Sequence, residues 1–163
     1  MNQQDKIQIE QLMRDKRFDD ALVSLAAIFE TQTDSVDAFY YSAVCLRYLN
    51  RFDEALEQLR ALRKIAPSYG RGLQEEGHIH RAKGNLKQAL HLYTRATYAN
   101  PSLQGSWRGQ IEILLKQNRE PEALRIKPHL ERVLKMPPPL ITAMDHIAQG
   151  KLSKAEDLCR DFL

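Results

Sequence analysis

The chain has few of the residues that metal or redox chemistry uses. Its 163 residues include two cysteines and five histidines, and neither type recurs at the spacing of a metal or redox motif. Cys45 and Cys159 lie far apart among apolar residues, where a cysteine is usually a small buried hydrophobe. The N-terminal segment is polar and has no apolar stretch of the secretory type. We therefore expect free thiols and a cytoplasmic protein.

Long apolar runs and a strong charge of either sign are missing as well. No run approaches the roughly 18 apolar residues of a membrane helix, so no membrane partner is expected. The net charge is only +3, and no base-reading side chains recur at matched positions, as they do in helical arrays that read RNA. The sequence predicts no nucleic-acid partner.

Groupings of catalytic side chains are not recognisable either. His78 and His80 stand two apart, and on a helix such side chains point about 200 degrees apart, so they cannot share one ion. We expect His80 on the buried side and His78 facing outward. Glu75 and Glu76 are adjacent and therefore diverge, which favours a solvated Glu75 over paired acid chemistry. The sequence predicts no catalytic, cofactor or metal residue, and we expect that this segment is not an enzyme.

What the chain does contain is an internal repeat. Alanine recurs in steps of 34 residues, and each alanine follows a polar turn segment with an amphipathic helical stretch on either side. The four segments are "RDKRFDDAL", "LNRFDEAL", "KGNLKQAL" and "QNREPEAL", which contain Ala21, Ala55, Ala89 and Ala123. The repeating unit is therefore a helix, a tight turn and a second helix.

Other positions of the unit recur at the same spacing. An alanine at the crossing of two helices lets their axes approach closely, and larger apolar residues fill the space beside it. Proline then stops the second helix. The recurring sets are Phe39, Leu73 and Trp107 with the small residues Ala43 and Gly77; Leu25, Leu59 and Tyr93; Phe18, Phe52 and Leu86; and Pro67 and Pro101.

A 34-residue unit with an early aromatic or Leu, a small residue four positions on, then Ala, an aromatic and Pro resembles the tetratricopeptide repeat. The resemblance implies an all-α fold, a right-handed α-α superhelix of about four helix pairs plus a partial fifth. A single array over 1–163 would contain repeats at about 2–35, 36–69, 70–103 and 104–137, and a partial repeat at 138–163.

Three residues depart from the pattern of that family. Thr33 stands where the closing proline is expected, and Ile111 occupies the slot of the small residue. Pro128 lies inside the second helix of its repeat, where a proline removes a backbone hydrogen bond, so a kink or break is expected there.

The C-terminal part begins another helix pair after "MPPPL", with a turn at Gly150 and an alanine at Ala155. This segment is similar to the N-terminal repeat region of bacterial proteins in which tetratricopeptide repeats precede a sulfotransferase domain. The similarity implies a longer protein whose catalytic domain follows Leu163, with this chain as its non-catalytic arm. Another hypothesis is self-association through an exposed C-terminal helix, because an uncovered apolar helix face tends to bind other apolar surfaces.

The family resemblance also implies where a partner would bind. The first helices of tetratricopeptide repeats line a concave groove that takes peptides or partner helices. The residues that we expect to bind there are Lys6, Arg14, Tyr40, Arg47, Tyr48, Arg71, Gln74, His78, Arg81, Arg108 and Lys116. Because cations outnumber acids on these helices, and Arg binds carboxylates through two hydrogen bonds, we expect an acidic protein or peptide. The alternative is that these cations only solvate an exposed helix face.

The carboxylate clamp of chaperone-binding tetratricopeptide domains does not fit this chain. Glu10 stands where that pattern needs Asn, Tyr41 replaces the second Asn, and Glu75 follows Arg71 where a further Arg is needed. Acids beside a carboxylate site would repel the ligand. We therefore expect a scaffold for another acidic partner.

Overall fold

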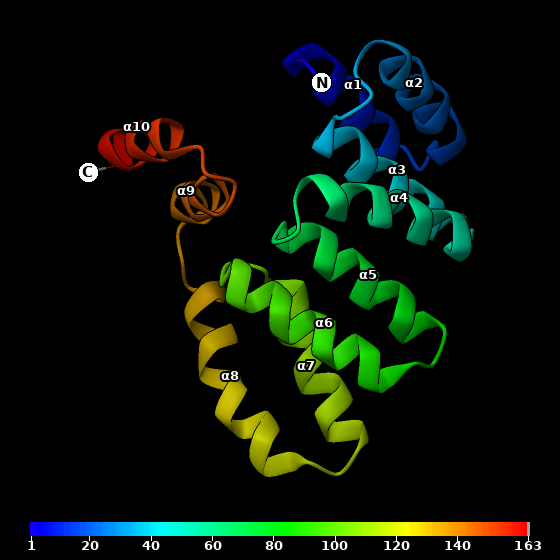
Figure 1. The fold of residues 1–163 in the computed structure, drawn as a ribbon. Helices are drawn as coiled ribbons and strands as arrows, with labels where there is room; N and C mark the ends of the chain where they lie inside the picture. Colours follow the sequence, from blue (N-terminus) through cyan, green and yellow to red (C-terminus); the bar gives the residue numbers. More distant parts are fainter. Residues whose placement is uncertain (163) are drawn as a thin grey trace. The chain divides into compact units, whose positions relative to one another are not determined.

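The computed structural model describes residues 1–162, and every regular element in that range is an α-helix. The helices follow one another as pairs joined by tight turns (Figure 1), so the predicted all-α solenoid is confirmed. The first helices of the pairs are α1 (Gln3–Arg14), α3 (Val36–Tyr48), α5 (Gly70–Ala82), α7 (Gln104–Lys116) and α9 (Pro138–Ala148). The second helices are α2 (Phe18–Thr31), α4 (Phe52–Ile65), α6 (Leu86–Ala99), α8 (Glu120–Leu134) and α10 (Leu152–Phe162).

The helices form two compact units. Unit 1 spans Met1–Pro67 and contains α1 to α4, and unit 2 spans Ser68–Leu163 and contains α5 to α10. Most consecutive helices within a unit pack on one another, both inside a pair and from one pair to the next, as α2 does on α3 and α6 on α7, whereas α9 packs mainly on α10. This nearest-neighbour packing is how a helical repeat array buries its faces.

Every first helix ends in the same kind of turn. The residue after the helix cap has a positive φ, which is 59° at Lys16, 59° at Asn50, 79° at Gly84, 57° at Asn118 and 72° at Gly150. The next backbone N–H then donates to the carbonyl five residues back, over 2.8 or 2.9 Å in each case. This left-handed cap satisfies carbonyls at the helix end that have no partner within the helix. The polar turn segment that recurs in the sequence contains this positive-φ residue.

The second helices of three repeats begin with a local ion pair. Arg17, Arg51 and Arg119 each donate through Nε to a carboxylate three residues on, over 2.7 Å. The hydrogen bond from Arg51 lowers the pKa of Glu54, and the bond from Arg119 lowers the pKa of Glu122. The acids also lie in the first turn of their helices, where the helix dipole favours negative charge.

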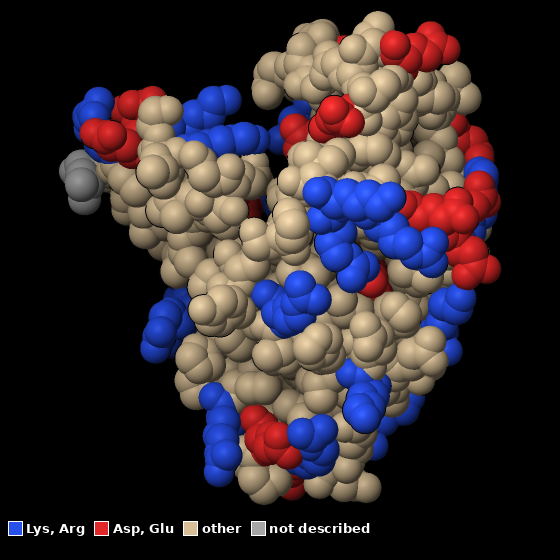
Figure 2. Space-filling view, in the orientation of Figure 1, with Lys and Arg blue, Asp and Glu red and all other residues tan. Residues whose placement is uncertain are grey.

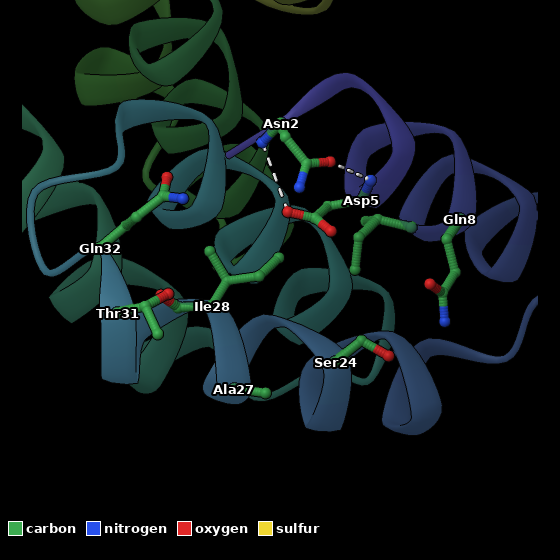
Figure 3. Close-up of a pocket in the computed structure, with 9 residues that line it drawn as sticks. Asn2, Asp5, Gln8, Ser24, Ala27, Ile28, Thr31 and Gln32 are labelled. Atoms are coloured by element: carbon green, nitrogen blue, oxygen red, sulfur yellow. Dashed lines mark hydrogen bonds between the residues drawn. The ribbon is translucent and has the colours of Figure 1, made fainter.

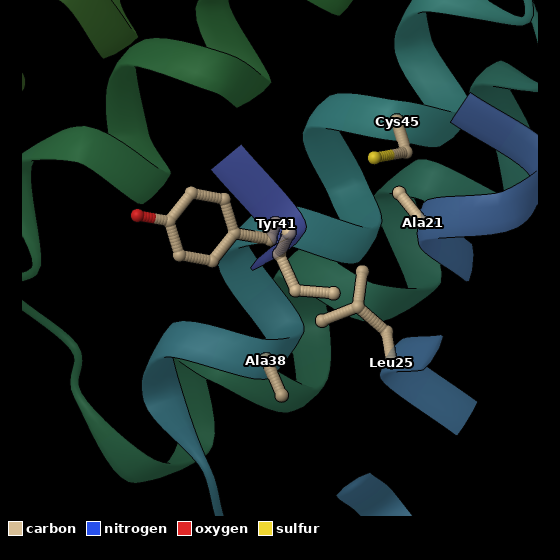
Figure 4. Packing of buried hydrophobic residues seen from close by; sticks show 6 residues of the cluster. Ala21, Leu25, Ala38, Tyr41 and Cys45 are labelled. Carbon is tan, nitrogen blue, oxygen red and sulfur yellow. The ribbon is translucent and has the colours of Figure 1, made fainter. Parts of the chain in front are cut away.

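The core of unit 1 forms where α1, α2 and α3 meet (Figure 4). Ala21 is fully buried there, as are Ala55 and Ala89 in the next repeats, and Ala123 and Ala155 are nearly so. The predicted role of alanine at the closest helix approach is confirmed. The buried residues of this cluster are Ile9, Ala21, Leu25, Ala38, Tyr41 and Cys45.

A tyrosine held between two glycines organises the core of unit 2. The ring of Tyr93 in α6 is fully buried, and it lies against Gly77 of α5 on one side and Gly109 of α7 on the other. A Cβ added at Gly77 would come within 2.7 Å of the ring, and one added at Gly109 within 2.4 Å. The ring therefore takes the space of both missing side chains. Ile111 holds the aligned slot in α7, but Gly109 makes the close contact.

Two expectations about proline and cysteine need correction or qualification. Helix α8 runs without interruption from Glu120 to Leu134 and includes Pro128, so the predicted break is wrong. The turns of α8 on either side of the proline remain helical, and Pro128 is exposed, so its ring meets solvent rather than a neighbouring helix. Both cysteines are free thiols, but only Cys45 is buried, whereas Cys159 is half-buried.

Candidate functional site

The eleven residues predicted to bind a partner all lie on α1, α3, α5 and α7. We call this set the first-helix face: Lys6, Arg14, Tyr40, Arg47, Tyr48, Arg71, Gln74, His78, Arg81, Arg108 and Lys116. The set divides between the two units, five residues in unit 1 and six in unit 2.

In α1 the cations of the face have local polar partners. Lys6 Nζ lies 4.0 Å from Glu10 Oε1, and the same carboxylate oxygen accepts a hydrogen bond of 2.5 Å from the hydroxyl of Tyr41. Burial, together with Glu10, raises the pKa of Tyr41 well above its usual range. Arg14 is exposed and donates to Gln11 Oε1 over 2.9 Å. The carboxylate of Glu10 therefore links α1 to α3 through its hydrogen bond with Tyr41.

An aromatic platform stands at the end of α3. The guanidinium carbon of Arg47 lies 4.3 Å from the centroid of the Tyr48 ring, within the range of a cation–π contact. Tyr48 stacks in turn on Phe18 of α2, with ring centroids 4.8 Å apart and planes 2° from parallel. Arg47 and Phe18 thus cover the two faces of the ring, and the 54% of Tyr48 that is exposed leaves its edge accessible to a partner. Tyr40 packs edge-on against Tyr41 at 5.2 Å and is half-buried.

In α5 the residues of the face are engaged within unit 2. Arg71 Nη2 donates to Asp145 Oδ2 of α9, and Gln74 Oε1 accepts a hydrogen bond of 3.0 Å from the Ser106 hydroxyl of α7. Arg81 Nη1 lies 2.5 Å from Glu112 Oε2, also of α7. These contacts bind α5 to its neighbours through groups that the sequence pattern assigned to a partner.

The two histidines of α5 do not divide as expected. His78 was predicted to face outward, but its Nδ1 lies 2.7 Å from the hydroxyl of Tyr93 and the side chain is half-buried. His80 is half-buried too, so it is not on the buried side alone. The cause is Tyr93, because a buried tyrosine needs a partner for its hydroxyl. Among residues 1–162 no cluster of His, Cys, Asp or Glu could hold a metal ion.

Two cations of α7 are the most accessible members of the face in unit 2. Arg108 and Lys116 are both exposed, and neither has an ion-pair partner in the described part of the chain. Unit 2 as a whole contains fifteen Lys and Arg against ten Asp and Glu, whereas unit 1 contains nine against eleven. Figure 2 shows Lys and Arg side chains spread over the visible face of α5 to α8. The positive charge of the protein is therefore a property of unit 2.

Several polar residues that matter to this surface escaped sequence reasoning. Asp145, Asn100 and Ser102 are buried and hydrogen-bonded together. Asn100 and Ser102 lie in the turn after α6, and Asp145 lies in the first helix α9, from which the sequence pattern assigned no residue to the face. Glu75, expected in solvent, is buried, and so is Glu76. No spacing rule identifies the contacts of Asp145, because its partners come from α5 and from the turn after α6.

A separate cleft opens between α1 and α2 in unit 1. It has a volume of about 460 Å³, and its walls are the polar sides of the two helices (Figure 3). Asn2 and Asp5 at its rim cap α1 by exchanging hydrogen bonds, 2.8 Å from the Asp5 N–H to Asn2 Oδ1 and 3.3 Å in the reverse direction. Because Asn2 and Asp5 are already hydrogen-bonded to each other, we interpret the cleft as part of the N-terminal cap of α1. Its lining residues are Asn2, Asp5, Gln8, Ile9, Ser24, Ala27, Ile28, Thr31 and Gln32.

The buried thiol of Cys45 is unreactive, and the helices of the described range include no membrane-spanning one. Burial raises the pKa of the Cys45 thiol to about 12, so it stays protonated and unreactive near neutral pH. Within residues 1–162 no helix has both the length and the apolar character that crossing a bilayer requires.

Comparison with known proteins gives a consistent result. A family model described as Tetratricopeptide repeat matches residues 10–70 and 75–126. PilF of Pseudomonas aeruginosa has a similar structure, with a TM-score of 0.71 at 16% identity, over 92% of this chain and 69% of that one. A thermophilic protein of this repeat type from Thermus thermophilus has a TM-score of 0.69 at 20% identity, over 96% and 87%.

A third similar structure comes from a protein complex. A chain of Naa15/Naa10 bound to HypK-THB has a TM-score of 0.68 at 15% identity, over 95% of this chain and 24% of that one. At such identities the likeness shows the fold alone. No curated protein sequence matches this chain.

Proposed function

This chain belongs to the tetratricopeptide repeat family, whose members are scaffolds for protein–protein interaction, and we propose that its first-helix face binds an acidic peptide or partner segment. The observation that carries the proposal is the pair of exposed cations Arg108 and Lys116 on α7, in a unit whose cations exceed its acids by fifteen to ten. Cations along one rigid helix attract an acidic segment and orient it by hydrogen bonds.

The platform of Arg47 and Tyr48 supports the same role in unit 1. A guanidinium held over a tyrosine ring is already oriented, so it loses less entropy when it pairs with a carboxylate. The exposed edge of the ring adds apolar contact area beside it. A partner with aspartate or glutamate next to an apolar residue would match the guanidinium and the ring edge.

The proposal is tested by titrating a labelled acidic peptide against two charge-matched double variants. Arg108→Glu with Lys116→Glu reverses two cations on the first helix α7. Lys87→Glu with Lys127→Glu reverses two exposed cations on the second helices α6 and α8. Both double variants change the net charge equally, so they separate local contacts from general attraction.

We expect the α7 variant to weaken peptide binding at least about tenfold, as the loss of two charge-assisted contacts implies. The control should weaken it less than about threefold, through long-range attraction that salt screens. If both double variants lose the same affinity at about 0.15 M salt, the cations of the first-helix face make no specific contact with the peptide and only keep an exposed helix surface hydrated. Fluorescence anisotropy measures the dissociation constants, and circular dichroism checks that the variants fold.

Self-association is a second candidate function, favoured by the fifth helix pair. Ile147 of α9 and Leu152 and Phe162 of α10 are apolar yet 55%, 65% and 46% exposed. A second copy could cover them and bury apolar surface. Sedimentation equilibrium across a hundredfold range of concentration tests this, with Leu152→Asp as the variant that should remain monomeric. A mass independent of concentration in the native protein would end this hypothesis.

The similarity to repeat regions that precede a sulfotransferase domain stays a prediction, as does the cytoplasmic location. Every regular element among residues 1–162 is a helix, so that range contains no strand followed by a glycine-rich phosphate loop.

A further inference from the structure

The carboxylate of Asp145 in α9 is held by donors from three other positions of unit 2. Its Oδ2 accepts a hydrogen bond from Arg71 Nη2 in α5. Its Oδ1 accepts one of 2.6 Å from Asn100 Nδ2, and the Ser102 hydroxyl lies 3.3 Å from the same oxygen. Asn100 and Ser102 belong to the turn between α6 and α7. A cation, an amide and a hydroxyl thus surround both oxygens of one carboxylate.

Two of these donors, Asn100 and Ser102, are oriented by contacts that do not involve α9. The backbone N–H of Ser102 donates to Asn100 Oδ1 over 2.9 Å, which turns the amide nitrogen of Asn100 toward Asp145. The Ser102 hydroxyl donates to the same amide oxygen over 2.7 Å. Asn100 and Ser102 are only 3% and 4% exposed. Both residues therefore have contacts that hold their orientation if the carboxylate of Asp145 leaves.

The helix that carries Asp145 is joined to the preceding repeats by a proline-rich segment. Three successive prolines, Pro137 to Pro139, separate α8 from most of α9, and they fix the backbone of the junction. Helices α9 and α10 pack mainly on each other. Asp145 is thus the polar group through which this helix pair meets α5 and the turn after α6.

We propose that Arg71, Asn100 and Ser102 form a carboxylate-binding site that Asp145 fills from within the chain, and that a side-chain carboxylate of an acidic partner takes when Asp145 leaves. This inference rests on the proposed function, because it names one site that includes Arg71 of the first-helix face and the group that competes for it. Binding of the partner and closure of the α9–α10 pair over Arg71 exclude each other. The apparent affinity for the partner is then reduced in proportion to the fraction of molecules in which Asp145 occupies the site.

The chemistry of the three donors selects the ligand class. Arg71 supplies a guanidinium, which pairs with planar carboxylates, and its side chain is 34% exposed, so an incoming group can reach it. The buried amide of Asn100 rejects a ligand that offers no acceptor, because the amide would lose its hydrogen bond. An aspartate or glutamate side chain satisfies both requirements.

The test uses a fluorescein-labelled peptide of four Asp-Ala repeats with an amidated C-terminus, so that only side-chain carboxylates are present. It is titrated against the native protein, Asp145→Asn and Asp157→Asn. Asp157 is an exposed acid of α10 that lies 3.8 Å from Arg160 Nη1. Its substitution changes the charge by the same amount without touching Arg71, which makes it the matched control.

We expect Asp145→Asn to bind the peptide at least about fivefold more tightly than the native protein, and Asp157→Asn to bind it less than twofold more tightly. Adding Arg71→Gln to Asp145→Asn should remove the gain. Equal affinities of the native protein and Asp145→Asn, with binding still sensitive to Arg108→Glu, would overturn this inference and leave the proposed function standing. Absence of binding to all of the variants would overturn both.

A second measurement needs no variant and therefore does not depend on the folding of Asp145→Asn. Hydrogen exchange of the α9 backbone amides is followed in the native protein as the same peptide is added. If the peptide displaces Asp145, exchange in α9 should speed up at least about threefold at saturation, while α6 amides keep their protection. If the peptide binds and the hydrogen-exchange rate of the α9 amides does not change, the proposal that the peptide replaces Asp145 is refuted.

Discussion

The two glycines that hold Tyr93 lead to a sharp prediction about Gly109→Ala. The added Cβ would lie 2.4 Å from Cε2 of the ring and 2.7 Å from Cζ, whereas carbon atoms in contact are about 3.5–4.0 Å apart. The ring would have to move by about 1 Å to restore that contact distance. It cannot do so freely, because Gly77 lies against its other edge and its hydroxyl is 2.7 Å from His78 Nδ1.

The size of the effect follows from two opposing contributions. Replacing a helical glycine by alanine stabilises a helix by about 1 kcal/mol, and overpacking a core costs about 1–3 kcal/mol. Gly105→Ala is the control, because its Cβ would meet the flexible amide end of Gln74 at 2.9 Å rather than a buried ring. We expect Gly109→Ala to be about 1–3 kcal/mol less stable than Gly105→Ala.

The assay is urea unfolding followed by the fluorescence of Trp107, the one tryptophan of the chain, which lies two residues before Gly109. Tyr93→Leu, the residue found at the equivalent positions 25 and 59, supplies the double-mutant test. In that background Gly109→Ala should cost at least about 1 kcal/mol less than in the native protein. Equal stability of Gly109→Ala and Gly105→Ala would refute the reasoning that the ring fills the missing side chain.

Three further predictions concern the turns, the thiols and the local ion pairs. Gly84 has a φ of 79° with nothing within 4 Å of an added Cβ, so Gly84→Ala should destabilise the protein by about 1 kcal/mol through backbone strain alone. Conversely, Lys16 has a φ of 59°, so Lys16→Gly should stabilise the protein by up to about 1 kcal/mol. Thermal unfolding measures both effects. Iodoacetamide at pH 8 should modify Cys159 first, since burial raises the pKa of Cys45 to about 12; mass spectrometry showing faster modification of Cys45 would contradict its burial. The pKa of Glu54 is lowered in the folded state, so its stabilising effect is present above its unfolded pKa of about 4.3 and is lost as pH falls through the folded value. The urea midpoint of Glu54→Gln should therefore fall less than that of the native protein between pH 5 and pH 3, and parallel declines would count against the Arg51–Glu54 bond.

Much of the fold could be predicted because its signals are local. The turn residue, the alanine at the helix crossing and the apolar residue beside it recur in the sequence as they do in space, as Ala55 and Leu59 show by their burial. Prediction failed where a residue's neighbours come from another repeat or another helix. His78 was expected in solvent, but its contact with Tyr93 depends on how α5 and α6 face each other. Pro128 was expected to kink or break α8, but the helix continues through it without a break.

The first-helix face was predicted by register, and register is a property of a single helix. The sequence alone determined which cations lie on α1, α3, α5 and α7, because a 34-residue repeat places the same positions on the same side of each first helix. Lys6 and Arg14 contact residues of their own helix, but only the tertiary structure decided which cations of α5 and α7 have partners. Arg71 meets Asp145, 74 residues away, and Arg81 meets Glu112, 31 residues away, whereas Arg108 and Lys116 remain exposed. Helical periodicity is encoded by neighbours along the chain, but a charge is paired or left in solvent by the packing of distant helices.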